Sequence, residues 1–440
     1  MSGNGNEEDV SHPSPISPLR EPTPLNRSAL SAPWRHGAEG LDFFLSCQPI
    51  FARNREVAAV ELHLEYHQGR RHGSLSDLEA ALSLVLASYR HVPRGGRIRS
   101  VPAVIRVPPQ LLVLPELPTL PRAQYIIEVS VNGAIDDDLV ERLRRFAGMG
   151  YCFALADYSL ADHRLRSLLG IAQIVRLDVA SLTEDELHAT VTALRPYRLD
   201  LLASGIADYE IFQRCRDAGC HYFQGNFLAT PTPVQGKKIS NSKQLLLQLL
   251  AELQNPNVTT TRLEQIAIRD ADFTYRILKI VNAAALGVGR AVDSISHAFA
   301  LLGTEEIRRW VNLLLIDRAG DKPEQLTRNM LIRGRMCELL AQLAGRPSPT
   351  DYFITGLLSQ LDVLMDMAMV DLMSQVPLQR TIKDALLHRI GPLGEILQDT
   401  ERYEQARFSE LRCLSNLSLY EIAYRHSTTW ANHVQLCLNA

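Results

Sequence analysis

The sequence predicts an α/β barrel of eight strands followed by an all-helical second half. Three observations lead to this prediction. Short β-rich runs alternate with helical stretches from Phe43 to about Thr230. These runs are apolar enough to be buried on both faces, as in a parallel sheet. No β-rich run follows Lys238, and 440 residues exceed what one ordinary core accommodates, so two domains are expected.

The predicted barrel consists of β-rich runs separated by helical segments such as DLEAALSLVLASYR and DDLVERLRRFAGMG. The eight runs, in order, are FFLSCQPIF, VAAVELHLEY, AVIRVP, YIIEVSV, YCFALADY, IVRLDV, LLASGI and HYFQGNFLA. Eight repeats favour a closed (β/α)8 barrel over an open sheet, because closure removes both edges. The third crossover, PQLLVLPELPTLPRAQ, is interrupted by proline, so the barrel is expected to be irregular there.

The helical half follows the segment TPTPVQGKKIS, where proline, glycine and lysine interrupt the pattern. Ser242 is placed to cap a helix with a broad leucine face, and Thr304 is placed to start another. Three parts are therefore predicted. They are a disordered tail at 1–40, rich in Pro, Ser, Asn and Glu, a barrel domain at 41–232, and a helical domain with a C-terminal helix at 233–440.

The composition is that of a soluble globular protein, with 46% hydrophobic and 22% charged residues. A net charge of −3 gives no general attraction to nucleic acid or anionic lipid and argues against both as partners. No apolar run approaches the roughly 18 residues of a membrane span, and the N-terminus lacks the order of a signal peptide. The seven cysteines are scattered without a C-x-x-C pair, as is typical of reduced thiols. These features predict a cytoplasmic protein.

A chain of short marks in the first half resembles the EAL family, whose members are (β/α)8 barrels that hydrolyse cyclic dimeric GMP. The resemblance covers about Phe43 to Pro233 and rests on the order and spacing of the marks rather than on any one of them. The marks are Gln48-Pro49-Ile50, Glu61 in AVELHLEY, Glu128 in IIEVS, Asp157 in LADY, Asp178 in VRLD, Gly205 in ASGIA and Gln224-Gly225 in YFQGNF.

The resemblance also implies that most of the catalytic machinery of this family is altered. Enzymes of the family bind a pair of divalent ions through carboxylates and an Asn at the strand ends, assisted by a Lys and a phosphate-binding Arg. Four of the matching positions keep the family residue, namely Glu61, Glu128, Asp157 and Gln224. The others are replaced: Glu65 stands for the phosphate-binding Arg, Arg106 for the Asn, Val131 and Ala156 for acids, Arg176 for the Lys, Ser204 for a Glu and His63 for a Leu. We therefore expect no hydrolysis, no bound metal and no cofactor.

Clustered carboxylates without a cation are costly to bury, and a guanidinium does not deprotonate in proteins. We hypothesise that Arg106, with Arg176 as a second candidate, pairs with Glu61, Glu128 or Asp157 and takes the place of the metal. The alternative is that Arg106 points into solvent and the acids are hydrated. His63 is interpreted as a packed or hydrogen-bonded residue rather than a ligand. Gln48 and Gln224 are expected to satisfy backbone groups.

The second half resembles the HDOD family, the helical relatives of the HD phosphohydrolases, from about Ser240 to Leu411. The marks follow the order of that family and are Asp270, Leu278, Asn282, Gly287, Ser294, Ile295, Ala298, Leu302 and Gly303. True HD enzymes bind metal through an adjacent His and Asp. Ser359 and Gln360 stand at these positions, and Asp362 alone binds no metal firmly. His297 is interpreted as a buried, hydrogen-bonded residue, and Asn282 as a residue that caps or bridges the backbone.

Without catalytic chemistry the function must lie in surfaces. Two arginine pairs, Arg308-Arg309 and Arg333 with Arg335, are interpreted either as one basic face for an acidic partner or nucleic acid, or as solvated helix faces. The C-terminal segment with Tyr420, Trp430 and Leu436 is expected to be a packing helix or a dimer surface.

The resemblance implies a non-catalytic bacterial signalling scaffold that acts through a protein partner in outputs related to cyclic di-GMP, such as motility or biofilm formation. The alternative is a receptor whose barrel binds the nucleotide without cutting it. A homodimer is a further alternative for the partner.

Overall fold

The computed structural model describes residues 43–66, 91–94, 97–107, 124–130, 135, 137–156, 158–161, 165–228, 252, 258–259, 262, 265, 323–376 and 378–439. Several predictions concern residues outside these ranges. They are the N-terminal tail, residues 109–123 of the third crossover, the helix starts at Ser242 and Thr304, and the residues Val131, Asp157, Asn282, His297, Arg308 and Arg309.

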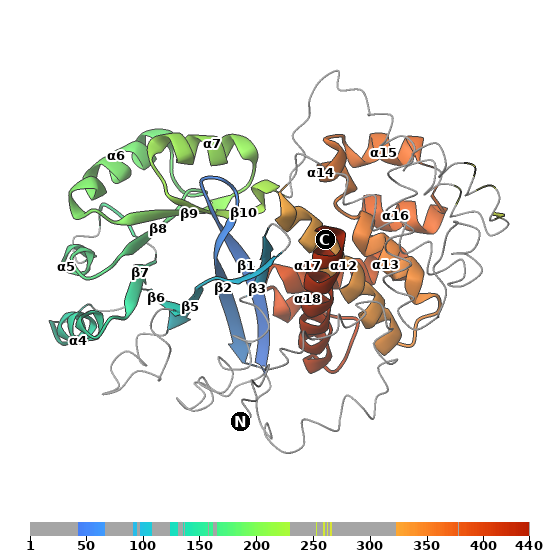
Figure 1. The fold of residues 1–440 in the computed structure, drawn as a ribbon, viewed down its shortest axis with the longest axis horizontal. Coiled ribbons are helices and arrows are strands. Elements are labelled where there is room, and N and C mark those ends of the chain that lie inside the picture. Colours follow the sequence, from blue (N-terminus) through green and yellow to red (C-terminus); the bar gives the residue numbers. More distant parts are fainter. Residues whose placement is uncertain are drawn as a thin grey trace, which may run out of the picture.

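Eight strands close into a barrel, as predicted. Each strand lies within, or within one residue of, one of the β-rich runs. The strands are β1 (Phe43–Ala52), β2 (Val57–Tyr66), β5 (Ala103–Val107), β6 (Tyr125–Val129), β7 (Cys152–Leu155), β8 (Ile174–Asp178), β9 (Asp200–Ile206) and β10 (Tyr222–Gly225). Their order around the barrel is β1-β10-β9-β8-β7-β6-β5-β2. Figure 1 shows the barrel beside the helical half, with β1 and β2 between them.

The expectation of an entirely parallel sheet is wrong for β1, which runs antiparallel to both β2 and β10. The other neighbouring pairs around the barrel are parallel. The cause lies in the connection after β1, which consists only of residues 53–56. A parallel connection must cross back over the sheet and needs about a dozen residues or more, whereas a hairpin needs only a few.

Four helices of the barrel half are described: α4 (Asp137–Gly148), α5 (Arg166–Leu169), α6 (Glu184–Leu194) and α7 (Tyr209–Ala218), with 3-10 turns η4 (Arg195–Tyr197) and η5 (Asn226–Leu228). Thr183 and Glu186 form a reciprocal capping box at the start of α6. Asp208 caps α7, which ends at Gly219 with a φ of 116°. A separate hairpin of β3 (His91–Arg94) and β4 (Arg97–Ser100) was not predicted.

The interior of the barrel contains an apolar layer to which each of its eight strands contributes one residue. These residues are Ile50, Ala59, Val104, Ile126, Ala154, Ile174, Leu202 and Tyr222. Because side chains alternate between the two faces of a strand, the next residues that face inward lie two positions away. A second interior layer therefore lies above the apolar one.

Every element described from residue 323 onward is helical, as predicted. The elements are α12 (Glu324–Leu343), α13 (Pro349–Leu358), α14 (Leu361–Met365), α15 (Met369–Gln375), α16 (Arg380–His388), α17 (Gly391–Glu404), η6 (Phe408–Glu410) and α18 (Ser418–Asn439). Helix α12 packs against α13, α17 and α18. In α18, Tyr420 is fully buried and the Trp430 ring contacts Phe353 of α13. The C-terminal segment is therefore a packing helix.

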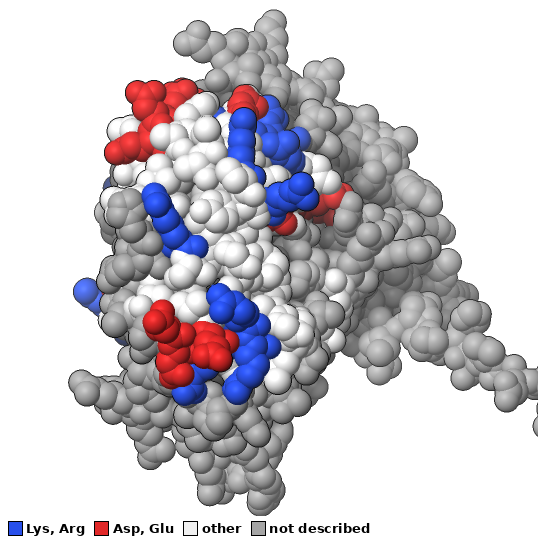
Figure 2. All heavy atoms as spheres, turned by 90° about the vertical axis from the view of Figure 1, so that its left-hand side faces the viewer, with Lys and Arg blue, Asp and Glu red and all other residues white. Residues whose placement is uncertain are grey.

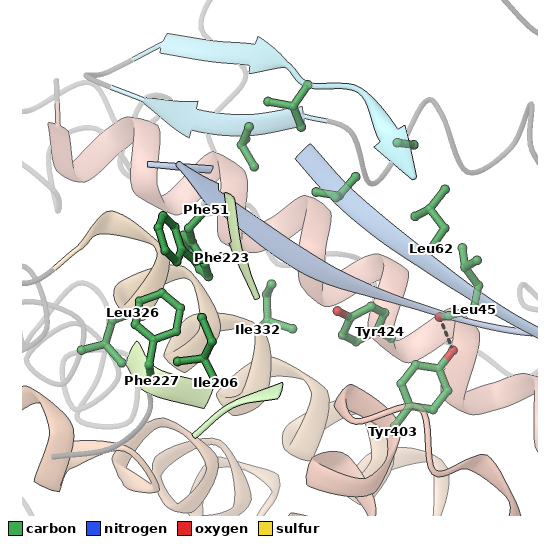
Figure 3. Packing of buried hydrophobic residues seen from close by; sticks show 14 of the residues in the cluster. Leu45, Phe51, Leu62, Ile206, Phe223, Phe227, Leu326, Ile332, Tyr403 and Tyr424 are labelled. Carbon is green, nitrogen blue, oxygen red and sulfur yellow. Dashed lines mark hydrogen bonds between the residues drawn. The ribbon is translucent and has the colours of Figure 1, made fainter. Parts of the chain in front are cut away.

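The two halves meet along β1. Strand β10 pairs only with Phe51 and Ala52, so it covers one end of β1 and leaves the rest of that edge to other partners. The Tyr403 hydroxyl of α17 donates to the Leu45 carbonyl at 2.7 Å (Figure 3). The Tyr424 hydroxyl of α18 donates to the Cys47 carbonyl at 3.2 Å. The helical half thus satisfies backbone groups of an edge strand.

Apolar packing joins the halves as well. Figure 3 shows Leu326 of α12 beside Phe227 and Ile206 of the barrel half, and all three belong to one buried cluster that extends through both halves. Among the described helices, none is long and apolar enough to cross a membrane.

Candidate functional site

The second interior layer of the barrel is polar. Its members lie two positions from the apolar layer, towards the carboxyl ends of the parallel strands. They are Gln48, Glu61, Arg106, Glu128, Ala156, Arg176, Ser204 and Gln224. The structure therefore brings together eight of the residues that the EAL resemblance singled out. Asp178, Gly205 and His63 are not members of this layer. Val131 and Asp157 lie outside the described residues, and of Glu65 only the backbone, paired with Phe44, is described.

Glu128 is the centre of this layer and is fully buried. Its Oε1 accepts hydrogen bonds from Arg106 Nε at 2.9 Å and Arg106 Nη2 at 2.7 Å. Its Oε2 accepts from Arg176 Nε at 2.6 Å. Arg106 reaches Glu128 because the two residues are direct partners on neighbouring strands. Both carboxylate oxygens thus receive charge-assisted hydrogen bonds, which are the stronger kind.

Arg176 also contacts the second buried acid. Its Nη2 lies 3.1 Å from Glu61 Oε2, and its Nη1 donates to Gln224 Oε1 at 2.7 Å. Gln224 Nε2 in turn donates to Glu61 Oε2 at 2.5 Å. Arg176, Gln224 and Glu61 therefore form a closed ring, and Arg176 links it to Glu128.

Burial raises the pKa of Glu61, but the opposing effects are together larger. The neighbouring His63, the positive charge of Arg176 and the Gln224 amide stabilise the carboxylate, so its pKa lies well below the usual value. His63 Nε2 lies 3.5 Å from Glu61 Oε2, so His63 packs beside this acid, in agreement with its interpretation as a packed or hydrogen-bonded residue. Glu61 is therefore ionised at neutral pH.

The pairing expected for Arg106 is present, yet Arg176 is the more central residue. The side chain of Arg106 is 51% exposed, whereas that of Arg176 is 9% exposed and contacts both acids. The alternative of an Arg106 that points into solvent without an acid partner is wrong. The two arginines and two glutamates balance in charge.

Two further predictions for this layer have separate outcomes. Gln48 contacts a backbone group as expected, since its Nε2 lies 3.5 Å from the Glu404 carbonyl in the helical half. Gln224 does not, because its partners are the side chains of Arg176 and Glu61. The physical reason is that a buried acid and a buried arginine need polar partners, and a single amide supplies both a donor and an acceptor.

Small residues occupy two positions where the EAL resemblance implies acids. Ala156 is fully buried, and the Ser204 hydroxyl donates to the Leu177 carbonyl at 3.2 Å. Over the part of the chain that the structure describes, no three or more His, Cys, Asp or Glu side chains lie together so that they could hold a metal ion.

A second arginine cluster lies in the helical half, where the resemblance places the metal-binding His and Asp. Ser359 and Gln360 are both buried. The Ser359 hydroxyl accepts from Arg333 Nη1 at 3.0 Å and donates to the Gly356 carbonyl at 2.7 Å. Arg333 Nη2 donates to Glu404 Oε2 at 2.6 Å. Arg333 therefore fills the position next to the altered residues.

Two glutamates of α17 complete this cluster. Glu401 Oε1 lies 3.5 Å from Arg333 Nη1 and 2.8 Å from Arg389 Nη2. Burial raises the pKa of Glu404, and the Arg333 charge offsets part of that effect. Sequence reasoning missed Glu401, Glu404 and Arg389. A signal existed, because Glu401 and Glu404 are three residues apart and therefore lie on one face of a helix.

Neither interpretation of Arg333 and Arg335, as part of a basic face or as part of a solvated helix face, agrees with the structure. Their side chains are 12% and 10% exposed, respectively, and both are ion-paired. Arg335 Nη1 lies 2.5 Å from Glu338 Oε2, and its guanidinium lies 5.9 Å from the centre of the Trp430 ring. Buried arginines require acidic partners, so they cannot serve as a free basic surface.

Comparison with known proteins identifies one of the two halves. Residues 239–389 match the family model of the HDOD domain, so the helical half carries an HDOD domain, with α17 and α18 outside the matched range. Over 380 residues the chain is 28% identical to the cyclic di-GMP phosphodiesterase CdgJ of Vibrio cholerae, covering 84% of this chain and 87% of that protein. Over 390 residues it is 25% identical to the uncharacterized protein YuxH of Bacillus subtilis, covering 87% and 95%.

Solved structures of EAL proteins resemble the chain more distantly. The EAL domain of FimX from Pseudomonas aeruginosa, bound to cyclic di-GMP, is 13% identical with a TM-score of 0.33, covering 42% of this chain and 89% of that one. The Bacillus subtilis YkuI protein, with cyclic di-GMP and calcium, is 13% identical with a TM-score of 0.35, covering 53% and 72%. The description of the barrel rests on its own strand pairing.

Proposed function

We propose that this chain is a non-catalytic regulatory protein of cyclic di-GMP signalling that acts by binding a protein partner in the cytoplasm. In this proposal the barrel has lost hydrolysis and has become a structural platform. The observation that carries the proposal is the position of Arg176, whose guanidinium lies 2.6 Å from Glu128 and 3.1 Å from Glu61.

Arg176 and Arg106 make metal binding unfavourable in two ways. They neutralise the carboxylates that would attract a divalent cation, and they place permanent positive charge where the cation would lie. A guanidinium cannot release its proton to make room. A divalent ion would have to displace a buried arginine from both acids and leave that charge without a partner, which typically costs several kcal/mol.

The link to cyclic di-GMP signalling is supported by the HDOD domain and by the similarity to CdgJ over most of both chains. CdgJ itself is named a phosphodiesterase. At 28% identity the two chains differ at most positions. The proposal rests on the residues that form the polar layer of this barrel. The arginines at positions 106 and 176 and the small residues at 156 and 204 argue against the same activity here.

Charge distribution supports a protein partner rather than nucleic acid. On the described part of the face in Figure 2, Lys and Arg lie among Asp and Glu rather than in a continuous basic surface. Arg142 and Asp138 of α4, for example, form an ion pair at 3.1 Å. Proteins that bind nucleic acid commonly present a basic stripe. The partner is therefore proposed to be a regulatory protein, with a second copy of this chain as the alternative.

The test is hydrolysis and binding of cyclic di-GMP by the full-length chain, with Mg²⁺ or Mn²⁺ and with EDTA. We expect no linear dinucleotide above a control without protein, and no heat of binding in calorimetry. Binding without hydrolysis would favour the receptor alternative. Metal-dependent release of linear dinucleotide that is lost in Glu61→Gln would overturn the proposal.

A further inference from the structure

The end of helix α7 brings two cysteines together. Gly219 adopts a left-handed conformation with a φ of 116°, which ends the helix. The amide of Cys220 then donates to the Cys215 carbonyl at 3.0 Å. This pattern of hydrogen bonds is that of a Schellman motif, in which the side chains at these two positions contact each other. Neither cysteine takes part in the polar layer of the barrel.

The turn therefore places the Cys215 and Cys220 side chains next to each other. Both are free and fully buried. At these positions an apolar pair would pack equally well. Two cysteines whose backbones are joined by this hydrogen bond are instead neighbours at a sharp turn, as the partners of a disulfide must be.

The surroundings of Cys215 favour its reactive form. The hydrogen bond from Cys220 lowers the pKa of the Cys215 thiol, burial opposes this, and the nearby Arg214 charge lowers it further, so that the pKa is lower than usual. For Cys337, by contrast, burial raises the pKa to about 12. Within the described parts of the chain, Arg214 Nε is buried and has no hydrogen-bond partner. A cation beside a thiol is the arrangement that activates cysteines.

We propose that Cys215 and Cys220 are a redox-sensitive pair that forms a reversible disulfide with an oxidant of the glutathione disulfide class. The Cys215 thiolate attacks one sulfur of the oxidant and forms a mixed disulfide, and one glutathione thiolate leaves. The Cys220 thiol then loses its proton and attacks Cys215, so that the protein disulfide forms and the second glutathione leaves. The protein loses two electrons and two protons, and one glutathione disulfide becomes two glutathione molecules.

Access to the buried pair requires the last turn of α7 to open, as helix ends do. The turn is at the surface, since the side chains of Arg216 and Asp217 are 37% and 68% exposed. A disulfide between Cys215 and Cys220 would affect the barrel. Arg53, in the turn between β1 and β2, donates to the Cys220 and Arg216 carbonyls at 2.9 and 3.0 Å. Strand β10, which carries Gln224, begins two residues later.

The test is to equilibrate the folded full-length chain in glutathione buffers of graded ratio, block the remaining free thiols and map the peptides by mass spectrometry. Trypsin cleaves after Arg214 and Arg216, so a disulfide links the dipeptide Cys215-Arg216 to the peptide that begins at Asp217. We expect this linked pair, lighter by two hydrogens, in oxidising buffer and its loss on reduction. In Cys220→Ser, Cys215 should instead retain glutathione.

Cys337 serves as the control within the same digest and should stay a free thiol. Two results would overturn the proposal. One is that both Cys215 and Cys220 remain free in the most oxidising buffer. The other is that the link forms only when the chain is unfolded in urea, because the native turn would then not promote it.

Discussion

At the scale of single residues, the central feature is a buried arginine in each half, close to the positions where the family resemblances imply metal ligands. Arg176 contacts both buried acids of the barrel, and Arg333 contacts two glutamates beside the altered residues of the helical half. In each case a guanidinium supplies the positive charge that a metal would supply, together with directed hydrogen bonds. The charge cannot dissociate, so each cluster is fixed in a way that a metal site is not.

Replacement of Arg176 by methionine removes this charge from between two buried carboxylates. We expect the variant to lose about 3–5 kcal/mol of unfolding free energy, because breaking a buried ion pair leaves uncompensated charge. Urea unfolding at neutral pH measures this loss. The matched control is Arg142→Met, whose surface pair with Asp138 is expected to contribute less than about 1 kcal/mol. Equal losses in the two variants would contradict the assigned role.

The lowered pKa of Glu61 predicts a dependence of stability on pH. A carboxyl group with a folded-state pKa below its unfolded value stabilises the fold above the unfolded value and loses that contribution as the pH falls. The ordinary value is 4.5, so the contribution is complete at neutral pH and declines in more acidic solution. In Glu61→Gln, stability should therefore fall less steeply below that pH than in the unaltered chain. Equal slopes in urea unfolding from pH 6 to 3, about the range in which carboxyl groups titrate, would contradict this.

The EAL resemblance singled out the residues that form the polar layer, and alternation along each strand explains why they face inward together. The sequence did not predict that Arg176 is the central arginine. Which of two arginines reaches both acids depends on side-chain depth in the closed barrel, where Arg176 is 9% exposed and Arg106 is 51% exposed. That depth follows from the shape of the whole barrel and not from spacing in the sequence.

Strand β1 is the informative element at the next scale. It is ten residues long, yet β10 pairs with only two of them. The helices α17 and α18 provide tyrosine hydroxyls for two carbonyls of the remaining edge. Uncovered edge strands tend to pair with other chains, so this cover also protects the molecule from association.

The variants Tyr403→Phe and Tyr424→Phe test the cover of β1. Each removes one hydroxyl donor and leaves a carbonyl without it, at an expected loss of about 1–3 kcal/mol for a buried acceptor. The loss should be larger for Tyr403, which is fully buried and has the shorter bond, 2.7 Å against 3.2 Å. Thermal unfolding measures both, with Tyr197→Phe as the control because that side chain is 43% exposed. A control that loses as much would argue against the edge contacts.

All eight strands of the barrel could be predicted, whereas two features of the sheet could not be obtained from β-rich runs alone. The antiparallel direction of β1 follows from the short connection at 53–56. The length of a connection is a different signal from the composition of the strands that it joins. The hairpin of β3 and β4 lies in HVPRGGRIRS, where a Gly-Gly pair is a hairpin signal and the flanking arginines obscure the alternation.

At the scale of the whole molecule, the two halves form one packed body. A single buried cluster includes residues of the barrel, of α12, of α17 and of α18. The two arginine clusters lie on either side of this contact. Gln48 of the polar layer contacts the Glu404 carbonyl, and the Glu404 side chain binds Arg333 of the other cluster. The halves are therefore expected to unfold together.

Hydrogen exchange in increasing urea tests this unity. Peptides from β8 and β9 and peptides from α12 and α13 should lose protection at the same urea concentration, because each half buries surface against the other. Tyr403→Phe should shift both sets together. Loss of protection in one half at a clearly lower urea concentration would show two independent domains instead.

The most direct test of the central claim is a titration of the full-length chain with Mn²⁺, followed by electron paramagnetic resonance of the free ion. Glu128→Gln, which retains a near-isosteric side chain, is the comparison. We expect both proteins to leave the free-ion signal equally high, because arginine already neutralises the buried carboxylates. A tight Mn²⁺ site in the unaltered chain that is absent from Glu128→Gln would contradict the account.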